Sequence, residues 1–163
     1  MSVKKNIKDS IIRAKVAMPQ YRPVRKNPGM KKCGKWCTAC PYIKEEKTVQ
    51  IDTQKTWKIN KNLNCESANI IYLIEYKKCK ERYIGESKRA LKYRLADHRG
   101  YVNREYLDTA TGAHFNKPGH DLSHLMVTIL EQVKSKDDIY RKEREKYLIN
   151  KFNTYYKGLN KQK

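Results

Sequence analysis

The sequence predicts an α+β fold, in which a small domain with a three-stranded antiparallel sheet flanked by helices follows a small cysteine-rich zinc module. Beyond residue 69, short runs rich in β-branched and aromatic residues alternate with two longer segments of helical periodicity. Four of the five cysteines lie between residues 33 and 65. We therefore divide the chain into a basic arm or linker (residues 1–31), a cysteine module (residues 32–66) and a main domain (residues 67–163).

The charge balance favours an anionic partner. The 163 residues include 37 Lys and Arg against 17 Asp and Glu, a net charge of +20. Cations that neutralise the phosphates of a nucleic acid release counterions, so DNA or RNA is the expected partner. No apolar stretch approaches the roughly 20 residues that span a membrane, so we expect no membrane partner. The alternative is a generally basic protein whose charge serves no partner.

Residues 1–31 combine basic side chains with three prolines and Gly29, after a short helix expected around Ile7 to Val16. We interpret this arm as a segment that contacts phosphates or assists nuclear import, with a solvated tail as the equal alternative. It contains no apolar run like that of a secretory signal, so we expect an intracellular, nuclear protein. In a reducing compartment, cysteines serve as thiols or metal ligands more often than as disulfides.

The cysteine module is too short to bury a core of its own, and segments below roughly 40 residues usually need a metal or a disulfide. Two short strand-like runs are expected in it, Thr48 to Asp52 and Trp57 to Ile59. Cysteines lie before and after these runs. We therefore expect the cysteines to hold the module together.

Three of these cysteines, Cys33, Cys37 and Cys40, are separated by three and then two residues. This spacing is close to the one by which three thiolates reach a tetrahedral zinc ion. Cys65 is the natural fourth ligand, because it lies where the module meets the main domain. Trp36 is expected to pack nearby. The alternative is a set of unpaired thiols.

The main domain begins with a predicted hairpin. Ile70 to Glu75 is rich in β-branched and aromatic residues, Lys77 to Lys80 is a polar turn, and Arg82 to Ile84 returns antiparallel. Gly85 is expected to end the second strand.

Two helices and a third strand follow the hairpin. Ser87 is the expected N-cap of a helix that reaches about Gly100. Residues 125–131 alternate as a third strand, and Ser135 is expected to begin a second helix that reaches about Phe152.

The helices carry three side chains of chemical interest. Arg94 and His98 are four residues apart and share a face of the first helix. Glu145 lies on or beside the core-facing stripe of the second helix. A buried carboxylate is costly without a cation, so Arg94, a metal ion or both should be near it. The alternative is an exposed salt bridge between Glu145 and Arg141.

Taken in order, these residues resemble the GIY-YIG nuclease superfamily across about 95 residues. The resemblance rests on Ile70-Ile71-Tyr72, Tyr83-Ile84-Gly85, Arg94, His98, Glu145 and Gly158-Leu159-Asn160. It implies that residues 67–163 are an endonuclease domain that hydrolyses phosphodiester bonds in DNA.

Within that superfamily the chain resembles the endonuclease of Penelope-like retroelements. The stretches that carry this closer resemblance are Cys33 to Pro41, Cys65 to Ile74, Tyr83 to Ser87 and His114 to Leu122. It implies an enzyme that nicks target DNA to prime reverse transcription, with an RNA template and a fused or associated reverse transcriptase as partners. Ile70 replaces the leading glycine of the superfamily, as is common in this branch. Tyr76 stands where a Cys-x-x-Cys pair of this branch would begin.

The resemblance also implies roles. Glu145 would hold one divalent cation, Mg²⁺ or Mn²⁺, because such hard cations prefer oxygen ligands. Arg94 would contact the scissile phosphate through its planar donors. Tyr72 would act as the general base or orient the attacking water. A free tyrosine has a pKa near about 10 and a free histidine near about 6.5, so His98 is the alternative base.

Three further residues complete the expected site. Tyr83 joins Tyr72 and His98 in one network, Asn160 ties the end of the chain to it, and Gly85 has a structural role. Taken singly, each has a plainer interpretation, such as a half-buried strand aromatic or a turn residue. Their joint order and spacing favour a site.

Cys79, His114 and His120 form a second candidate zinc site, because the two histidines are separated by five residues, as in many zinc modules. The resemblance implies two cysteines and two histidines here, but a tyrosine occupies the place of the other cysteine. Either Cys65 moves to complete this site or the site binds metal poorly. His124 is expected to be an exposed loop residue.

The leading hypothesis is therefore a metal-dependent DNA endonuclease with one or two structural zinc ions. Two alternatives remain. One is a zinc-stabilised nucleic-acid binding module with an inactive nuclease fold, and the other is a structure-specific nuclease of the repair type that acts on branched or damaged DNA.

Overall fold

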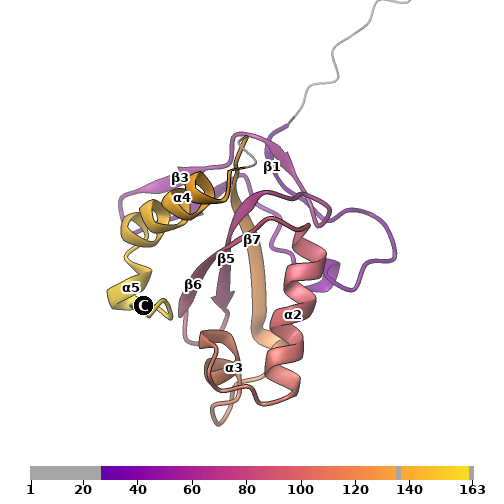
Figure 1. Ribbon diagram of the computed structural model, residues 1–163, viewed down its shortest axis with the longest axis vertical. Helices are drawn as coiled ribbons and strands as arrows, with labels where there is room; N and C mark the ends of the chain where they lie inside the picture. Colours follow the sequence, from indigo (N-terminus) through magenta and orange to yellow (C-terminus); the bar gives the residue numbers. More distant parts are fainter. Residues whose placement is uncertain (1–26, 135–136, 162–163) are drawn as a thin grey trace, which may run out of the picture.

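A computed structural model describes residues 27–134 and 137–161 of the chain (Figure 1). The helix expected around Ile7 to Val16, most of the basic arm and Ser135 lie outside the described residues. The elements follow one another as β1 (Gly29–Met30), the 3-10 helix η1 (Cys40–Tyr42), β2 (Thr48–Gln50), β3 (Thr56–Lys58), β4 (Asn62–Leu63), β5 (Ile70–Tyr76), β6 (Arg82–Ser87), α2 (Leu91–Asn103), α3 (Ala110–Phe115), the 3-10 helix η2 (Leu122–His124), β7 (Leu125–Gln132), α4 (Asp138–Lys151) and α5 (Thr154–Lys157).

The main domain is built on a three-stranded antiparallel sheet in the order β6-β5-β7. The predicted hairpin is confirmed, because β5 pairs with β6 so that Tyr72 lies opposite Gly85 and Ile74 opposite Tyr83. Cross-strand partners share a face of a sheet, and so do alternate residues of one strand. Tyr72 and Tyr83 therefore lie on the same face. β7 is the third predicted strand and pairs with the other edge of β5.

Two smaller sheets accompany the main one. β2 and β3 form an antiparallel ribbon at the two predicted strand-like runs of the cysteine module. β1 and β4 form a parallel pair that the sequence did not predict. The predicted single sheet is thus only part of the β-structure. Strands of two residues are too short to show the alternation by which a strand is recognised in a sequence.

Gly85 lies inside β6, so the prediction that it ends the strand is wrong. The strand continues to Ser87. A Cβ atom on residue 85 would lie 2.5 Å from the hydroxyl oxygen of Tyr72. The glycine therefore leaves room for that hydroxyl on the facing strand.

The first long helix, α2, begins and ends later than predicted. Ser87, which was expected to cap it, is the last residue of β6, and Gly100 lies inside the helix. The first N–H groups of α2 donate to the carbonyls of Cys65 and Ser67 at 2.9 and 3.0 Å. Carbonyls at the end of the cysteine module thus take the place of a capping side chain.

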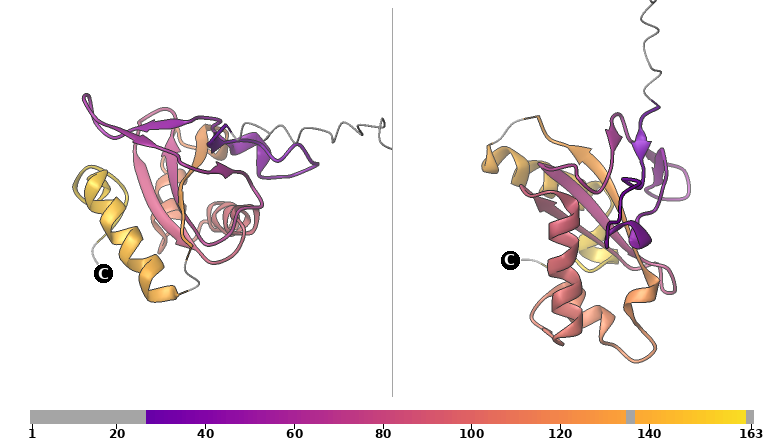
Figure 2. Two further views of the ribbon diagram at one scale, coloured as in Figure 1. Left: turned by 90° about the horizontal axis from the view of Figure 1, so that it is seen from above. Right: turned by 90° about the vertical axis from the view of Figure 1, so that its right-hand side faces the viewer.

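The three-stranded sheet lies between two sets of helices, with α2 and α3 on one side and α4 and α5 on the other (Figures 1 and 2). α4 begins at Asp138, and the side chain of Asp137 caps it by accepting from the backbone N–H of Ile139. Its end at Lys151 is within one residue of the predicted Phe152. Helices from distant parts of the sequence therefore meet around one sheet.

The cysteine module runs along β7. The indole of Trp57 donates to the carbonyl of Leu130 at 2.8 Å, and Ile43 forms a parallel bridge with Val127. The module thus covers the outer edge of β7, which would otherwise present unpaired backbone groups.

One buried core includes residues of both the cysteine module and the main domain. Tyr72, Tyr76 and Phe115 are among its largest fully buried side chains, and Val49 and Ile59 of the cysteine module are buried in the same core. The domain boundary between residues 66 and 67 stays a prediction. No helix within residues 27–134 and 137–161 is long and apolar enough to cross a membrane.

Candidate functional site

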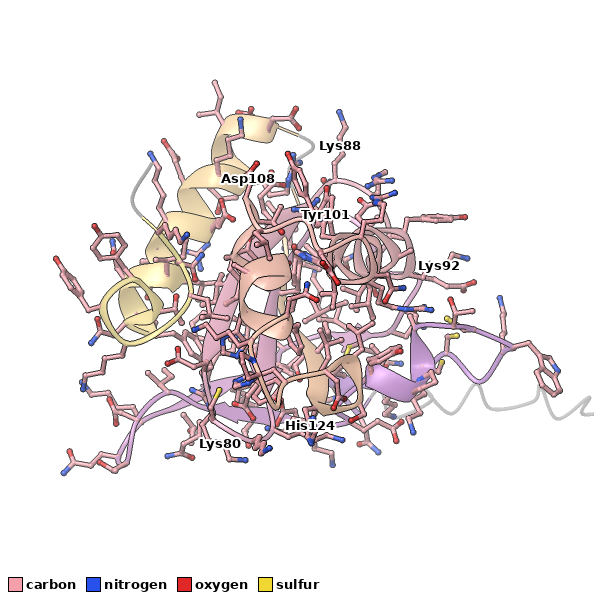
Figure 3. The ribbon with its side chains drawn as sticks, turned by 90° about the horizontal axis from the view of Figure 1, so that it is seen from below. Lys80, Lys88, Lys92, Tyr101, Asp108 and His124 are labelled. Atoms are coloured by element: carbon pink, nitrogen blue, oxygen red, sulfur yellow. The ribbon has the colours of Figure 1, made fainter. Side chains whose placement is uncertain are left out.

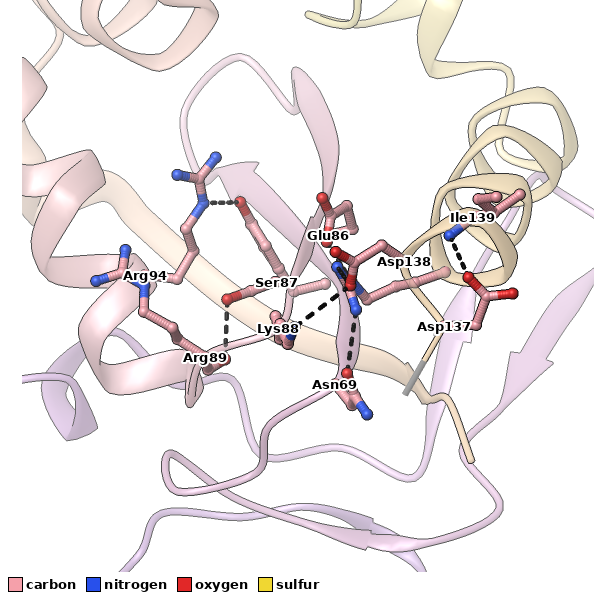
Figure 4. A network of polar contacts seen from close by, with 11 residues as sticks. Asn69, Glu86, Ser87, Lys88, Arg89, Arg94, Asp137, Asp138 and Ile139 are labelled. Atoms are coloured by element: carbon pink, nitrogen blue, oxygen red, sulfur yellow. Dashed lines mark hydrogen bonds and ion pairs between the residues drawn. The ribbon is translucent and has the colours of Figure 1, made fainter. Parts of the chain in front are cut away.

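The hydroxyl of Tyr72 is the centre of a buried hydrogen-bond network. Arg94 lies on α2 and donates from Nε to the Tyr72 hydroxyl oxygen at 3.0 Å (Figure 4). The same oxygen lies 2.7 Å from Nε2 of His98. A guanidinium can only donate, so the single proton of the phenol is left for His98. Tyr72 therefore donates to Nε2 of His98.

The other side of His98 fixes its tautomer. Nδ1 lies 2.9 Å from the hydroxyl oxygen of Thr111, at the start of α3. Since Nε2 accepts from Tyr72, a neutral imidazole carries its proton on Nδ1 and donates to Thr111. Burial, with repulsion from Arg94, lowers the pKa of His98 to about 3. His98 is therefore neutral at physiological pH and ready to accept at Nε2.

Thr111 was not among the residues expected from the sequence. Its side chain is buried, and the packing of α3 against α2 places it beside His98. A threonine near the start of a short helix has no local pattern that marks it as part of a site. The contact arises from tertiary structure alone.

Both phenols are held in the protonated form. Burial raises the pKa of Tyr72, and the charge of a Tyr83 phenolate would raise it further, against the opposing effect of Arg94. Burial also raises the pKa of Tyr83, followed by the negative charge of Glu145. The Tyr83 ring lies 5.8 Å from the His98 ring, centre to centre. Tyr72 therefore cannot take a proton without giving up the one it holds.

Glu145 lies on α4, in the helical layer on the other side of the sheet from α2 (Figure 1). It lies half-buried on α4, one turn before the buried Leu148, and its charge acts on both Tyr72 and Tyr83. Arg141, the alternative partner considered for Glu145, is buried and bonds Glu86, Asp138 and Asn69 (Figure 4). One carboxylate oxygen, completed by water and phosphate oxygens, is a usual ligand set for Mg²⁺. The residues present therefore fit a single divalent cation at Glu145.

Asn160 pairs with the edge strand of the sheet. Its amide accepts from the N–H of Ile84 at 2.9 Å and donates to the carbonyl of Ile84 at 2.7 Å. A Cβ on Gly158 would lie 2.5 Å from the carbonyl oxygen of Arg82, so a glycine is needed where the chain approaches the strand. Asn160 thus anchors the end of the described chain between Tyr83 and Gly85. It positions the strand that carries them.

We call Tyr72, Tyr83, Arg94, His98 and Glu145 the tyrosine site. A guanidinium, a phenol paired with a neutral imidazole and a carboxylate able to hold a hard cation are the groups that phosphodiester hydrolysis requires. The fold and the site thus define a protein of the nuclease class.

Comparison with known families agrees with this class. Residues 68–160, more than half of the 163, match the GIY-YIG catalytic domain. The chain belongs to the GIY-YIG family of nucleases. No curated protein and no solved structure matches the chain in such comparisons.

Four thiols of the cysteine module form a compact cluster. The sulfur of Cys40 lies 3.5 Å from that of Cys33 and 3.6 Å from that of Cys65, and all four sulfurs, including Cys37, lie within 4.8 Å of one another. Zinc–sulfur bonds of about 2.3 Å in a tetrahedron separate the sulfurs by about 3.8 Å. The cluster could therefore hold zinc, and Cys65 lies with this cluster and not with the second one.

The environment of these thiols also suits a cation. Burial raises the pKa of Cys65 and of Cys40. Thiolates in this setting need a positive charge beside them, which a zinc ion would supply. Trp36, which was expected to pack on the cluster, is fully exposed, so that expectation is wrong.

The second cluster offers three ligand atoms, from Cys79, His114 and His120, within 4.8 Å of one another. The sulfur of Cys79 lies 3.4 Å from Nε2 of His114. The ring of Tyr76 stacks on that of His120, with the centres 4.4 Å apart. Burial lowers the pKa of His114 to about 4, so it is neutral, as a ligand must be. Structural zinc sites have four protein ligands, so these three residues make a more open site.

His124 is not the exposed loop residue that was expected. It lies half-buried in η2 at the end of the molecule where Lys80 also lies (Figure 3). Its Nδ1 is 3.3 Å from the hydroxyl of Tyr76. In the sequence, Tyr76 was recognised only as a departure from a cysteine pattern. The contact between Tyr76 and His124 depends on how the buried ring of Tyr76 is oriented.

Proposed function

We propose that the protein is a metal-dependent endonuclease that hydrolyses phosphodiester bonds in DNA. The observation that carries the proposal is the hydrogen-bonded series from Arg94 through Tyr72 to His98, with Glu145 acting on the same phenols. The net charge of +20 supports a polyanionic substrate.

The network provides a path for the proton of the attacking water. The water oxygen forms a bond to phosphorus while its proton passes to the Tyr72 oxygen, and the phenol proton passes to Nε2 of His98 at 2.7 Å. The bond from phosphorus to the 3′ oxygen breaks, and that oxygen takes a proton from solvent. In this scheme Tyr72 and His98 act together as the base.

Arg94 and Glu145 stabilise the negative charge of the phosphate in this scheme. Arg94 holds Tyr72 through Nε, and the rest of its guanidinium binds the scissile phosphate. Glu145 would hold a divalent cation, Mg²⁺ or Mn²⁺, which would supply Lewis-acid charge to the phosphate oxygens. Thr111 keeps the acceptor nitrogen of His98 turned toward Tyr72.

The finer proposal is an enzyme of the Penelope-like type that nicks target DNA in the nucleus to prime reverse transcription. It rests on the resemblance of residues 33–41, 65–74, 83–87 and 114–122 to that branch. Its further partners would be an RNA template and a fused or associated reverse transcriptase. The four-cysteine cluster would bind a structural zinc, and the cluster at Cys79 would bind zinc more weakly.

The proposal is tested by incubating purified protein with supercoiled plasmid and Mg²⁺. We expect nicked circles whose 3′ ends carry a hydroxyl that a polymerase can extend, and we expect Tyr72→Phe to lose nearly all nicking. Protein that binds DNA with a steep salt dependence but never nicks it would favour the inactive binding module. Nicking only of branched or damaged duplexes would favour the repair-type nuclease.

A further inference from the structure

The side chain of Trp36 is fully exposed, so burial in the core does not explain the presence of a tryptophan at this position. It lies in the loop between two ligands of the four-thiol cluster, Cys33 and Cys37, with a relative exposure of 109%. The other tryptophan, Trp57, is half-buried and donates to the carbonyl of Leu130. A tryptophan buries 150–250 Å² where it packs, so Trp36 leaves a large apolar face in water.

The surroundings of Trp36 are cationic. Lys32 and Lys35 are exposed and line the same hollow as Trp36, and the ammonium of Lys35 also pairs with Glu66 at 3.2 Å. Gly34, at φ +72°, lets the loop turn with open space beside it. Lys32, Lys35 and Trp36 line a shallow hollow of about 410 Å³, whose described lining contains no acid. An aromatic plane between lysines matches a nucleic acid, which presents phosphates and the π-faces of its bases.

The loop lies against the helix that carries Arg94. Glu66 pairs with Lys35 at 3.2 Å and with Lys92 of α2 at 3.6 Å, and Lys92 points outward on the side of α2 where the cysteine module lies (Figure 3). Arg99 of α2 donates to the carbonyl of Thr38 at 3.3 Å. A helix is about 10–12 Å across. One turn of duplex DNA spans about 34 Å, which is longer than the width of this helix.

We propose that Trp36, Lys32 and Lys35 form a second contact to duplex DNA, beside the bond that is cut. The lysines bind backbone phosphates, and the indole packs on the bases or sugars of the same stretch. This inference rests on the proposed function to the extent that the substrate is DNA. If this contact exists, the four-thiol cluster also holds the DNA-binding loop between Cys33 and Cys37 in place.

Tryptophan fluorescence tests the contact directly, because the chain has two tryptophans. A 30-base-pair duplex is titrated into Glu145→Gln protein, which we expect to bind DNA and to cut it too slowly to affect the titration. We expect the emission of exposed Trp36 to be quenched and the same titration of Trp36→Phe to show little quenching. Trp36→Ala should raise the Kd for DNA about tenfold, the range for losing one stacked base.

Tyr156 provides a matched control, because it is 82% exposed and lies on α5 in the opposite layer. Tyr156→Ala should leave the Kd within about twofold, as an exposed residue outside the contact should. Equal Kd values for the two alanine variants, or unchanged Trp36 emission at saturating DNA, would overturn the inference. Zinc content and thermal unfolding of Trp36→Ala should match those of the parent.

The two proposals fail separately. If the wild-type protein nicks DNA and Trp36→Ala nicks it with the same KM, the contact is wrong while the proposed function stands. If no nicking occurs but DNA quenches Trp36, the contact stands and the proposed function is wrong. Quenching by an acidic peptide and not by DNA would assign the loop to a protein partner and overturn the contact.

Discussion

The tyrosine site and the four-thiol cluster are both groups of titratable side chains, yet they relate to the fold in opposite ways. In the tyrosine site, Arg94, Tyr72, His98 and Thr111 satisfy one another through hydrogen bonds, on a sheet and helices that the core already holds. In the cluster, four sulfurs lie within 4.8 Å, and only a cation would let them be thiolates together. The fold places the residues of the tyrosine site, whereas a cation bound to the four thiols would hold the cysteine module together. Substitutions should therefore change chemistry at one and stability at the other.

The largest effect should come from Arg94→Ala. Removal of the guanidinium that we propose to bind the scissile phosphate should lower the nicking rate by about 10² to 10³-fold. The melting temperature should change by only a few degrees, because Arg94 contributes one hydrogen bond to Tyr72 and one part-exposed ion pair to Asp97 at 3.8 Å. Rates on supercoiled plasmid and calorimetry on the same samples check this. If the nicking rate falls only because the variant is less folded, the proposed difference between the tyrosine site and the four-thiol cluster is wrong.

The converse effect should come from Cys37→Ser. We expect loss of one equivalent of zinc and a melting temperature lowered by about 5–10 °C, because a zinc ion bound to the four thiols would stabilise the cysteine module. Metal analysis and thermal unfolding measure these quantities.

Cys79→Ser serves as the matched thiol control, since Cys79 is exposed and belongs to the more open cluster. It should lower the melting temperature less than Cys37→Ser does. Fully folded wild-type protein without any zinc would rule out the four-cysteine site.

Acid should destabilise the tyrosine site through His98. Its pKa falls from 6.5 in the unfolded chain to about 3 in the fold, so the unfolded state binds the proton more readily between these values. The contribution of His98 to stability is present above pH 6.5 and is lost as the pH falls toward 3, by about 1.4 kcal/mol per pH unit.

Urea unfolding of wild type and His98→Gln between pH 4 and 7 tests this sign. The variant should show a flatter dependence of the free energy of unfolding on pH. Comparison of the two proteins removes the contribution of His114, whose pKa is also lowered, and of the carboxylates. Parallel curves would mean that His98 is not held neutral by its surroundings.

The smallest effect should come from Thr111→Val. Without its hydroxyl, the Nδ1 proton of His98 loses its acceptor, which is worth about 1 kcal/mol and thus about a fivefold lower kcat. KM should not change, because Thr111 does not reach DNA. Thr111→Ser should restore kcat, and a Thr111→Ser variant as slow as Thr111→Val would argue for a packing role instead.

Local sequence patterns predicted most of the strands and helices that carry the tyrosine site. The hairpin and the third strand followed from β-branched and aromatic runs, and the helical period placed Glu145 beside the core. The thiol spacing indicated which cysteines would meet. Each of these features depends on residues close in sequence or on a simple repeat.

Features that depend on packing between distant segments were missed. The first N–H groups of α2 donate to the carbonyls of Cys65 and Ser67. The prediction that Ser87 caps this helix was therefore wrong. Thr111 and His124 reach their partners only because α3 and η2 fold back on the sheet. The exposure of Trp36 could not be read from its hydrophobic character, because the short loop between Cys33 and Cys37 has no core to enter.

The most direct test of the tyrosine site is the single-turnover nicking rate of Glu145→Gln in Mg²⁺, measured beside Glu143→Gln. Both residues lie on α4, and Glu143 is exposed, so the pair changes the same charge at two positions of one helix. We predict that Glu145→Gln lowers the rate at least about 100-fold while DNA affinity stays within a few-fold, and that Glu143→Gln leaves both unchanged. A Glu145→Gln protein that nicks DNA at the wild-type rate would contradict the account.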